Sequence, residues 1–272
     1  MKPPLTYYGA KVGIASRIAA VLPSHGHYVE PFAGSLAVLL AKTPADHETV
    51  NDIDGDLMTF WRMLRDDPEG LERVCALTPH SRAEHKAAYK PAADDLERAR
   101  RVWIMLTQGR GGTLRPTGWR YYQDPAGSSA SMPRYLSGYV ARMAPAAARL
   151  ARVSLECRPA LEVIEAYGRE PCCLLYCDPP YLGSLRSLNY QHEMSSEDEH
   201  RKLAGALQAC HSAVVLSGYH SALYDEMYAG WYRYEIPTAT GQAHQWSTRT
   251  EVLWSNRPFP ASQMDLFGEV AG

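Results

Sequence analysis

A run of apolar residues at Cys172–Cys177 ends directly at Asp178-Pro179-Pro180-Tyr181 and limits the possible folds more than any other part of the chain. An apolar run of this length predicts a strand buried on both faces, as in a parallel sheet covered by helices. The two prolines offer no backbone N–H and hold the chain extended, so the strand ends there. The sequence therefore predicts an α/β sheet with a polar tetrapeptide after a central strand.

Helix and strand patterns alternate before and after a long middle segment, which predicts a Rossmann-like, doubly wound, mostly parallel sheet with an insertion. Before the insertion we expect a helix over 12–22, a strand at His27–Glu30, a turn at Pro31–Ser35, a helix over Leu36–Lys42, a strand ending at Thr49–Asp52 and a helix over Gly55–Arg65. After it we expect strands at Arg152–Glu156, Cys172–Cys177 and Ala213–Leu216, helices over 159–167, 196–210 (capped by Ser196) and Ser221–Tyr228, and two antiparallel strands at Trp231–Pro237 and Glu251–Trp254.

The middle segment has a different character. Residues 67–108 are charged and suit helices, residues 109–133 form a loop rich in Gly, Ser, Pro and Arg, and residues 135–150 return to a helix. A loop of that length in a compact protein is usually functional or mobile. The domains we expect are a discontinuous one over 1–57 and 151–256, a mainly helical insertion over 58–150, and an extended tail over 257–272.

The charges are unevenly distributed, although the formal net charge of the whole chain is only −2. Residues 98–158 contain eleven arginines, no lysine and two acidic residues, so this segment carries +9 and the rest of the chain −11. Such asymmetry favours a basic face that binds nucleic acid. Arginines scattered over solvated helices are the alternative. The cysteines show no zinc-like spacing, so we expect no metal site.

Two further features follow predicted strands. In Glu30-Pro31-Phe32-Ala33-Gly34-Ser35 the glycine lets a ligand approach the backbone, and the helix that follows offers free N–H groups. Asp52 ends the next strand, where a carboxylate can accept both hydroxyls of a ribose. An ordinary turn and a helix cap remain the alternative. After the central strand, the Asp178 carboxylate and the Pro179 carbonyl can point together into a cleft.

In this combination and order the sequence resembles the Dam-like, alpha-group DNA adenine methyltransferases, which use S-adenosylmethionine (AdoMet) and have the class I methyltransferase fold. The resemblance covers roughly residues 5–57 and 150–255. It includes Tyr7-Tyr8-Gly9-Ala10-Lys11, which is similar to the aromatic-x-Gly-Gly-Lys motif of the family. By this resemblance the AdoMet-binding residues are Tyr7, Lys11, Glu30, Pro31, Phe32, Gly34, Asp52 and Asp178, and the catalytic residues are Asp178, Pro179, Pro180 and Tyr181.

The chain departs from the family at Ala10 and Leu36, each of which replaces a glycine. A leucine at the second position is expected to hold a ligand further from the backbone. The resemblance implies transfer of a methyl group to the exocyclic 6-amino group of an adenine flipped out of duplex DNA, with no metal. The alternatives are methylation of an RNA adenine or a protein glutamine, and an inactive DNA-binding relative.

DNA contacts are expected in the insertion, from Arg110, Arg115 and Arg120, which are interleaved with aromatic residues. The tail contains Gln263, Leu266 and Phe267 in an arrangement that resembles the peptide by which bacterial DNA enzymes bind the replication sliding clamp. We expect a bacterial or phage-encoded protein, in a restriction-modification or phage context, that lies in the cytoplasm on the nucleoid and has no membrane partner.

Overall fold

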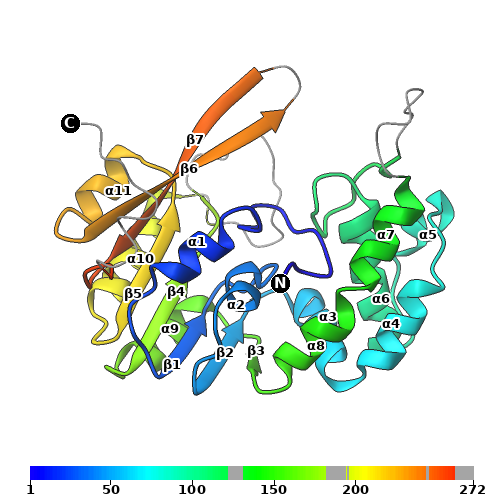
Figure 1. The fold of residues 1–272 in the computed structure, drawn as a ribbon, viewed down its shortest axis with the longest axis horizontal. Helices are drawn as coiled ribbons and strands as arrows, with labels where there is room; N and C mark the ends of the chain where they lie inside the picture. The colour runs from blue at the N-terminus through cyan, green and yellow to red at the C-terminus, as the bar shows by residue number, and fades with distance from the viewer. Residues whose placement is uncertain (122–130, 182–193, 195, 243–244, 261–272) are drawn as a thin grey trace.

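The computed structural model describes residues 1–121, 131–181, 194, 196–242 and 245–260. Its centre is a seven-stranded sheet in the order β3-β2-β1-β4-β5-β7-β6 (Figure 1). The first five strands are parallel, whereas β7 runs antiparallel to β5 and to β6. The strands are β1 His27–Glu30, β2 His47–Asn51, β3 Ser154–Glu156, β4 Cys173–Cys177, β5 Ala213–Gly218, β6 Tyr232–Gln242 and β7 Gln245–Ser255. This confirms the predicted doubly wound, mostly parallel sheet.

Strand β4 lies between β1 and β5, and all five of its residues are buried. Because side chains alternate along a strand, Leu174 and Tyr176 join one core cluster, whereas Leu175 and Cys177 join a second cluster on the opposite face. Burial on both faces explains why this strand appears in the sequence as a continuous apolar run.

Helices cover both faces of the sheet. Helices α1 (Ala15–Ala20) and α2 (Ala37–Ala41) pack against each other and contribute to the first cluster. Helices α9 (Ala160–Gly168), α10 (Glu197–Gln208) and α11 (Ala222–Met227) contribute to the second. The capping box of Ser196 and Glu199 fixes the start of α10, as predicted. Within the described residues, no helix is both long enough and apolar enough to cross a membrane.

A separate group of helices lies between β2 and β3 in the chain, on the right in Figure 1. Helix α3 packs against α4, α6 and α8, and the completely buried Trp61 and Trp103 belong to the same cluster as the α2 side of the sheet. The helices are α3 Gly55–Asp66, α4 Pro68–Ala76, α5 Arg82–Ala87, α6 Asp95–Gln108, α7 Met132–Val140 and α8 Met143–Leu150.

Two expectations about element length were wrong. The single helix expected over 135–150 is two helices, α7 and α8, because Pro145 has no N–H to bond the carbonyl of Ala141 and continue one helix. The two last strands extend further than expected and pair from Tyr232 with Ser255 to Gln242 with Gln245. Figure 1 shows this hairpin projecting beyond the rest of the sheet, and its outer residues lack the apolar alternation from which a strand is recognised.

Candidate active site

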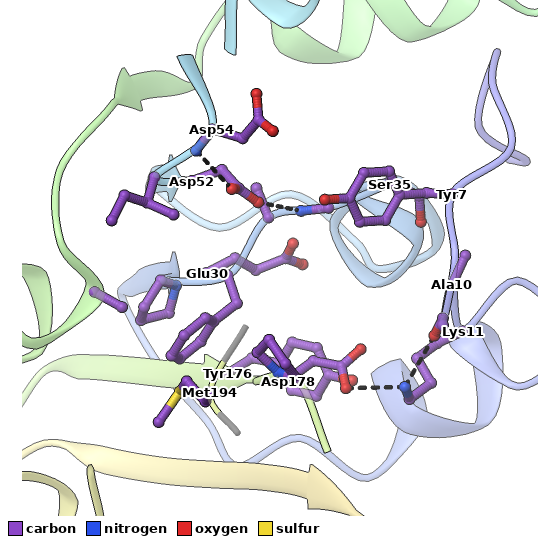
Figure 2. Close-up of a pocket in the computed structure, with 18 of the residues that line it drawn as sticks. Tyr7, Ala10, Lys11, Glu30, Ser35, Asp52, Asp54, Tyr176, Asp178 and Met194 are labelled. Carbon is purple, nitrogen blue, oxygen red and sulfur yellow. Dashed lines mark hydrogen bonds and ion pairs between the residues drawn. The ribbon is translucent and has the colours of Figure 1, made fainter. Parts of the chain in front are cut away.

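A cavity of about 410 Å³ opens at the carboxyl ends of β1, β2 and β4 (Figure 2). In an open α/β sheet this edge is where ligands bind, at the point where the strand order reverses between β1 and β4. The volume lies within the range of small-molecule sites. Nine of the predicted site residues line it, namely Tyr7, Lys11, Glu30, Pro31, Phe32, Gly34, Asp52, Asp178 and Pro180.

The turn around Gly34 is held in place before any ligand binds. Its N–H donates to Asp52 Oδ2 at 3.0 Å, and its carbonyl accepts a hydrogen bond from Trp61 Nε1 at 3.1 Å. The residue has a φ of +47°, and a Cβ there would lie only 3.2 Å from the ring of Tyr7. Glycine is therefore required both by the backbone conformation and by the close approach of Tyr7.

Leu36 adopts a left-handed backbone conformation that normally favours glycine. With φ 55° it is the only described non-glycine residue with positive φ, and it forms the N-cap of α2. Its side chain is completely buried in the first core cluster and is not among the residues that line the cavity. The expected hindrance of a ligand by this leucine therefore has no support in the geometry. Ala10, the other departure, does line the cavity.

Asp52 organises the second strand end. Its Oδ2 accepts the N–H of Gly34, and its Oδ1 accepts the N–H of Asp54, also at 3.0 Å (Figure 2). Asp54 in turn caps α3 by accepting the N–H groups of Asp56 and Leu57. Each carboxylate oxygen has a second lone pair, so Asp52 can still accept hydrogen bonds from a ligand in the cavity.

Glu30 is buried below the same loop. Its Oε1 accepts hydrogen bonds from the hydroxyl of Tyr28 at 2.6 Å and from the N–H of Leu39, in α2, at 2.8 Å. Burial raises the pKa of Glu30 to about 8, and the two hydrogen bonds offset only part of this effect. At neutral pH the carboxyl group is therefore mainly protonated.

Lys11 and Asp178 form an ion pair at the other end of the cavity, with Lys11 Nζ 2.8 Å from Asp178 Oδ1 (Figure 2). Burial alone would lower the pKa of Lys11, but the negative charges of Asp178 and Glu251 raise it above the ordinary value. The ammonium also lies 4.6 Å from the centre of the Tyr181 ring, and the Tyr181 hydroxyl donates to Asp178 Oδ1 at 3.0 Å. Pro179, between them, is buried.

Several residues of the site were not predicted. Ile53 and Leu161 line the cavity although 45% and 42% of their surfaces are exposed, so they form apolar walls open to a ligand. Met194 and Tyr176 line it as well. Ile53 could have been identified from its place directly after Asp52. Leu161 could have been identified because it follows shortly after the end of β3. Among the described residues, no three His, Cys, Asp or Glu side chains are grouped as metal ligands would be.

Tyr219 extends the site beyond the cavity. It follows β5, it is 39% exposed, and its ring packs edge to face against Tyr181 with centroids 4.7 Å apart. The sequence pattern left open whether Ser217-Gly218-Tyr219 borders the substrate or forms a plain turn. The contact brings an exposed aromatic face next to Tyr181 and Asp178.

Many of the positive charges of the arginine-rich segment, residues 98–158, are neutralised by nearby carboxylates. Five of its eleven arginines form ion pairs with carboxylates, namely Arg98, Arg100, Arg101, Arg149 and Arg158. These five guanidinium groups are therefore already paired with carboxylates of the protein. Of the predicted DNA-binding residues, Arg110 is exposed, and Arg115 and Arg120 are half-buried.

An aromatic stack lies in the same loop. The ring of Trp119 stacks on His80 at 4.3 Å and on Tyr121 at 5.7 Å, and the guanidinium of Arg82 lies 4.7 Å from the Trp119 ring. Arg110 lies near the exposed Tyr121 ring at 6.0 Å. The stack is bordered by cationic groups, a composition that suits nucleic acid.

The amino-terminal segment joins this loop to the cavity. The N–H of Tyr8 donates to the carbonyl of Gly112 at 2.8 Å, and the Thr6 hydroxyl donates to the carbonyl of Leu106. Gly112 has a φ of +65°, and a Cβ there would lie 3.3 Å from the backbone of Tyr7. The loop that contains Arg110 is thus anchored directly beside the residues that line the cavity.

Comparison with known proteins agrees with this geometry. A family model described as D12 class N6 adenine-specific DNA methyltransferase matches residues 7–101. Type II methyltransferase M1.LlaDCHI of Lactococcus lactis subsp. cremoris is 23% identical over 288 aligned residues, which cover 94% of this chain and 95% of that protein. The chain is therefore similar to adenine-specific DNA methyltransferases.

The Retron Ec67 DNA adenine methylase of Escherichia coli is a further relative, 25% identical over 235 residues that cover 82% of this chain and 79% of that protein. The segment matched by the family model contains the Tyr7–Lys11 segment, the Glu30–Gly34 loop and Asp52, and ends before Asp178. Among solved structures, a putative methyltransferase from Streptococcus mutans in complex with SAH is similar at 9% identity over 90% of this chain and 98% of that chain, with a TM-score of 0.33, too low to support an argument.

Proposed function

We propose that this adenine methyltransferase uses the cavity to bind AdoMet and uses Asp178 to present the 6-amino group of a flipped-out adenine in duplex DNA. The observation that carries the proposal is the position of Asp178. Its carboxylate lines the same cavity as the Gly34 loop, is anchored by Lys11, and lies beside the aromatic pair of Tyr181 and Tyr219. Cofactor and base would therefore meet at one carboxylate.

The lining fits AdoMet in its chemical character. Ile53, Leu161 and Phe32 supply apolar surface for the adenine ring of the cofactor, and Asp52 supplies a carboxylate for the ribose hydroxyls. Lys11 supplies a cation, and the Gly34 loop forms part of the lining. The buried Tyr176 lines the cavity, and its hydroxyl can donate to a polar ligand atom.

AdoMet, when bound, supplies an electrophilic methyl group on a sulfonium. The adenine amine is a poor nucleophile because its lone pair is delocalised into the ring. Hydrogen bonds from its two protons to Asp178 and to the Pro179 carbonyl favour a tetrahedral nitrogen whose lone pair is free. Held in line with the C–S bond at about 3–3.5 Å, that nitrogen would form the N–C bond as the C–S bond breaks. S-adenosylhomocysteine would leave, and the methylated amine would lose one proton to solvent. The base reaches the site only after it leaves the duplex stack.

The rings of Tyr181 and Tyr219 are assigned to the flipped base. One face of Tyr181 is covered by the Lys11 ammonium, whereas Tyr219 is exposed. An extrahelical adenine needs an aromatic or apolar surface to replace the stacking that it loses. The exposed ring next to Asp178 offers such a surface, and this supports Tyr219 as a stacking residue in addition to the predicted Tyr181.

DNA recognition is assigned to the insertion, residues 58–150, with Arg110, Arg115 and Arg120 as contacts. Residues 1–57 and 151–256 would form the catalytic domain. Support comes from the exposed Arg110, the neighbouring aromatic stack and the anchoring of this loop at the rim of the cavity. The arginines that are already paired with carboxylates are not assigned a DNA contact.

The sliding-clamp contact of the tail, residues 257–272, remains a sequence-based part of the proposal. Gln263, Leu266 and Phe267 lie outside the described residues. A peptide of residues 260–272 should bind a bacterial sliding clamp, and the same peptide with Leu266 and Phe267 replaced by alanine should not. Equal affinity of the two peptides would remove this partner from the proposal. A location on the nucleoid would follow from the DNA and clamp contacts.

The decisive experiment is transfer of a tritiated methyl group from AdoMet to DNA duplexes of varied sequence and, in parallel, to RNA and to protein, followed by analysis of the modified nucleoside or amino acid. The expected product is N6-methyladenine, formed in a restricted sequence context. Label in RNA or in protein glutamine, with none in DNA, would favour the alternative substrates. AdoMet binding without transfer to any substrate would indicate an inactive relative.

A further inference from the structure

A second carboxylate, that of Glu251, shares contacts with Asp178. Glu251 belongs to β7, the antiparallel strand, and only 3% of its surface is exposed. It is not part of any motif recognised in the sequence, and it does not line the cavity. Burial of a glutamate costs free energy unless it is paired and hydrogen-bonded. Its partners are therefore informative.

Two of the partners of Glu251, Lys11 and Tyr181, also hold Asp178. Its Oε1 accepts a hydrogen bond from Ser217 Oγ at 2.6 Å and another from the Tyr181 hydroxyl. The same oxygen lies 3.8 Å from Lys11 Nζ. The two carboxylates thus share one phenol and one ammonium.

This arrangement limits how the shared groups can move. The Tyr181 hydroxyl has a single proton, so it can donate to only one of the two carboxylates at a time. The Lys11 ammonium has three protons and also donates to the carbonyl of Gly9 at 3.0 Å. Ser217 fixes Glu251 from the end of β5. The cluster is therefore tied to three segments of the fold.

We propose that Glu251 is a positioning residue for methyl transfer, which orients Tyr181 and shares the positive charge of Lys11 so that Asp178 remains a strong acceptor for the adenine amine. The inference rests on the proposed function. An ammonium paired with Asp178 alone would draw charge from the oxygen that has to accept the amine proton. A second carboxylate on the same ammonium reduces this effect and holds the Tyr181 ring in place.

The electrostatics of the cluster provide a readout. Burial and the nearby charge of Asp178 raise the pKa of Glu251 above its ordinary value, although Lys11, Ser217 and Tyr181 oppose the shift. The groups that face it are those four and Tyr176. If ionised Glu251 is required, the rate of transfer falls on the acid side as Glu251 becomes protonated.

The test compares Glu251→Gln and Glu251→Ala with the wild-type enzyme in single-turnover methylation of a duplex that the wild type modifies. The matched control is Glu48→Gln, because Glu48 is equally buried and pairs with Lys42 and Arg149 away from the cavity. Folding of each variant is verified by circular dichroism. The affinity for AdoMet and for DNA is measured by calorimetry and by fluorescence anisotropy.

Glu251→Ala should lower the transfer rate about 100-fold, as expected for loss of alignment, while both affinities stay within about threefold. Glu251→Gln should restore part of the rate because it keeps the acceptor, but its rate should no longer fall on the acid side. Glu48→Gln should keep the wild-type rate and pH profile. Wild-type rates and profiles in both Glu251 variants, or an equal loss in Glu48→Gln, would overturn the inference. A wild-type enzyme that methylates no adenine would instead refute the proposed function.

Discussion

Lys11 Nζ and Asp178 Oδ1 lie 2.8 Å apart, and this ion pair joins the segment before α1 to the end of β4. Lys11 does not belong to a strand, so the order of the strands does not place it near Asp178. The two residues meet because the amino-terminal segment folds over the cavity. The contact explains why a lysine near the start of the chain can be part of the same site as the tetrapeptide after the central strand.

Replacement of Asp178 by alanine should abolish methyl transfer while AdoMet affinity stays within about tenfold, because the carboxylate is proposed to act mainly on the adenine amine. The variant should also be less stable than the wild type, since Lys11 is 93% buried and would lose its nearest partner. Single-turnover methylation and calorimetry measure the first two quantities. Transfer within a few-fold of the wild-type rate would remove Asp178 from the mechanism.

Asp52→Ala should weaken AdoMet binding by about 10- to 100-fold, because it would remove the hydrogen bonds proposed for the ribose and releases the N–H of Gly34 from its anchor. Asp56→Ala is the matched control, since Asp56 is a nearby carboxylate that pairs with Arg98 and does not line the cavity. Calorimetric titration with AdoMet distinguishes the two variants. An unchanged affinity in Asp52→Ala would place the ribose contact elsewhere.

Substitutions of Leu36 should show an inverted order of stability. Leu36→Ala and Leu36→Gly both remove a buried side chain, at a cost of about 2–5 kcal/mol in the free energy of unfolding. Glycine normally destabilises a site relative to alanine, but here φ is +55°, so glycine should be the more stable by about 1 kcal/mol. Urea denaturation of the two variants measures the difference. If the alanine variant is the more stable, no strain is stored at this position.

Glu30→Gln should change how stability depends on pH. Because the folded-state pKa is raised from 4.5 to about 8, the stabilisation by the protonated carboxyl is fully present below pH 4.5 and is lost as pH rises through about 8. Glutamine keeps an acceptor for Tyr28 and Leu39 and does not titrate. Its stability relative to the wild type should therefore rise between about pH 5 and about pH 9, as measured by urea midpoints. A constant difference would show that Glu30 is ionised throughout.

Arg110→Ala should reduce the salt dependence of DNA binding if Arg110 contacts a phosphate. The slope of log K against log salt concentration should flatten by about one unit, to a similar extent for every duplex. Arg98→Ala is the control, because Arg98 already pairs with Asp56. A base contact would instead relax specificity at one position. If the two variants bind every duplex alike, the recognition surface excludes Arg110.

The fold could be predicted well where a local signal matched the tertiary environment. His27–Glu30 was placed at its observed bounds because it is short, buried and followed by a proline. Cys173–Cys177 was recognisable because burial on both faces leaves an uninterrupted apolar run. The outer half of the β6–β7 hairpin carries no such apolar pattern, so its strands could not be placed from the sequence.

The site was predictable only where its residues form contiguous motifs. Asp52, Gly34 and Asp178 follow strand ends, so their neighbourhood was implied by the parallel order of the strands. Glu251 and Leu161 reach the site from elements whose sequences read as ordinary structure, and only the three-dimensional arrangement reveals them. The count of arginines overestimated how many are available to contact DNA, because charge along a chain does not show which residues have carboxylate partners.

The bond from Tyr8 N–H to the Gly112 carbonyl has a thermodynamic consequence. Tyr8 lines the cavity, and Gly112 belongs to the loop that carries Arg110, so occupation of either surface acts on the same short piece of chain. If bound AdoMet makes the free energy of DNA binding more favourable, bound DNA makes the free energy of AdoMet binding more favourable by the same amount, because linkage between two ligands is reciprocal. The factor by which AdoMet tightens DNA binding therefore equals the factor by which DNA tightens AdoMet binding, and measuring one fixes the other.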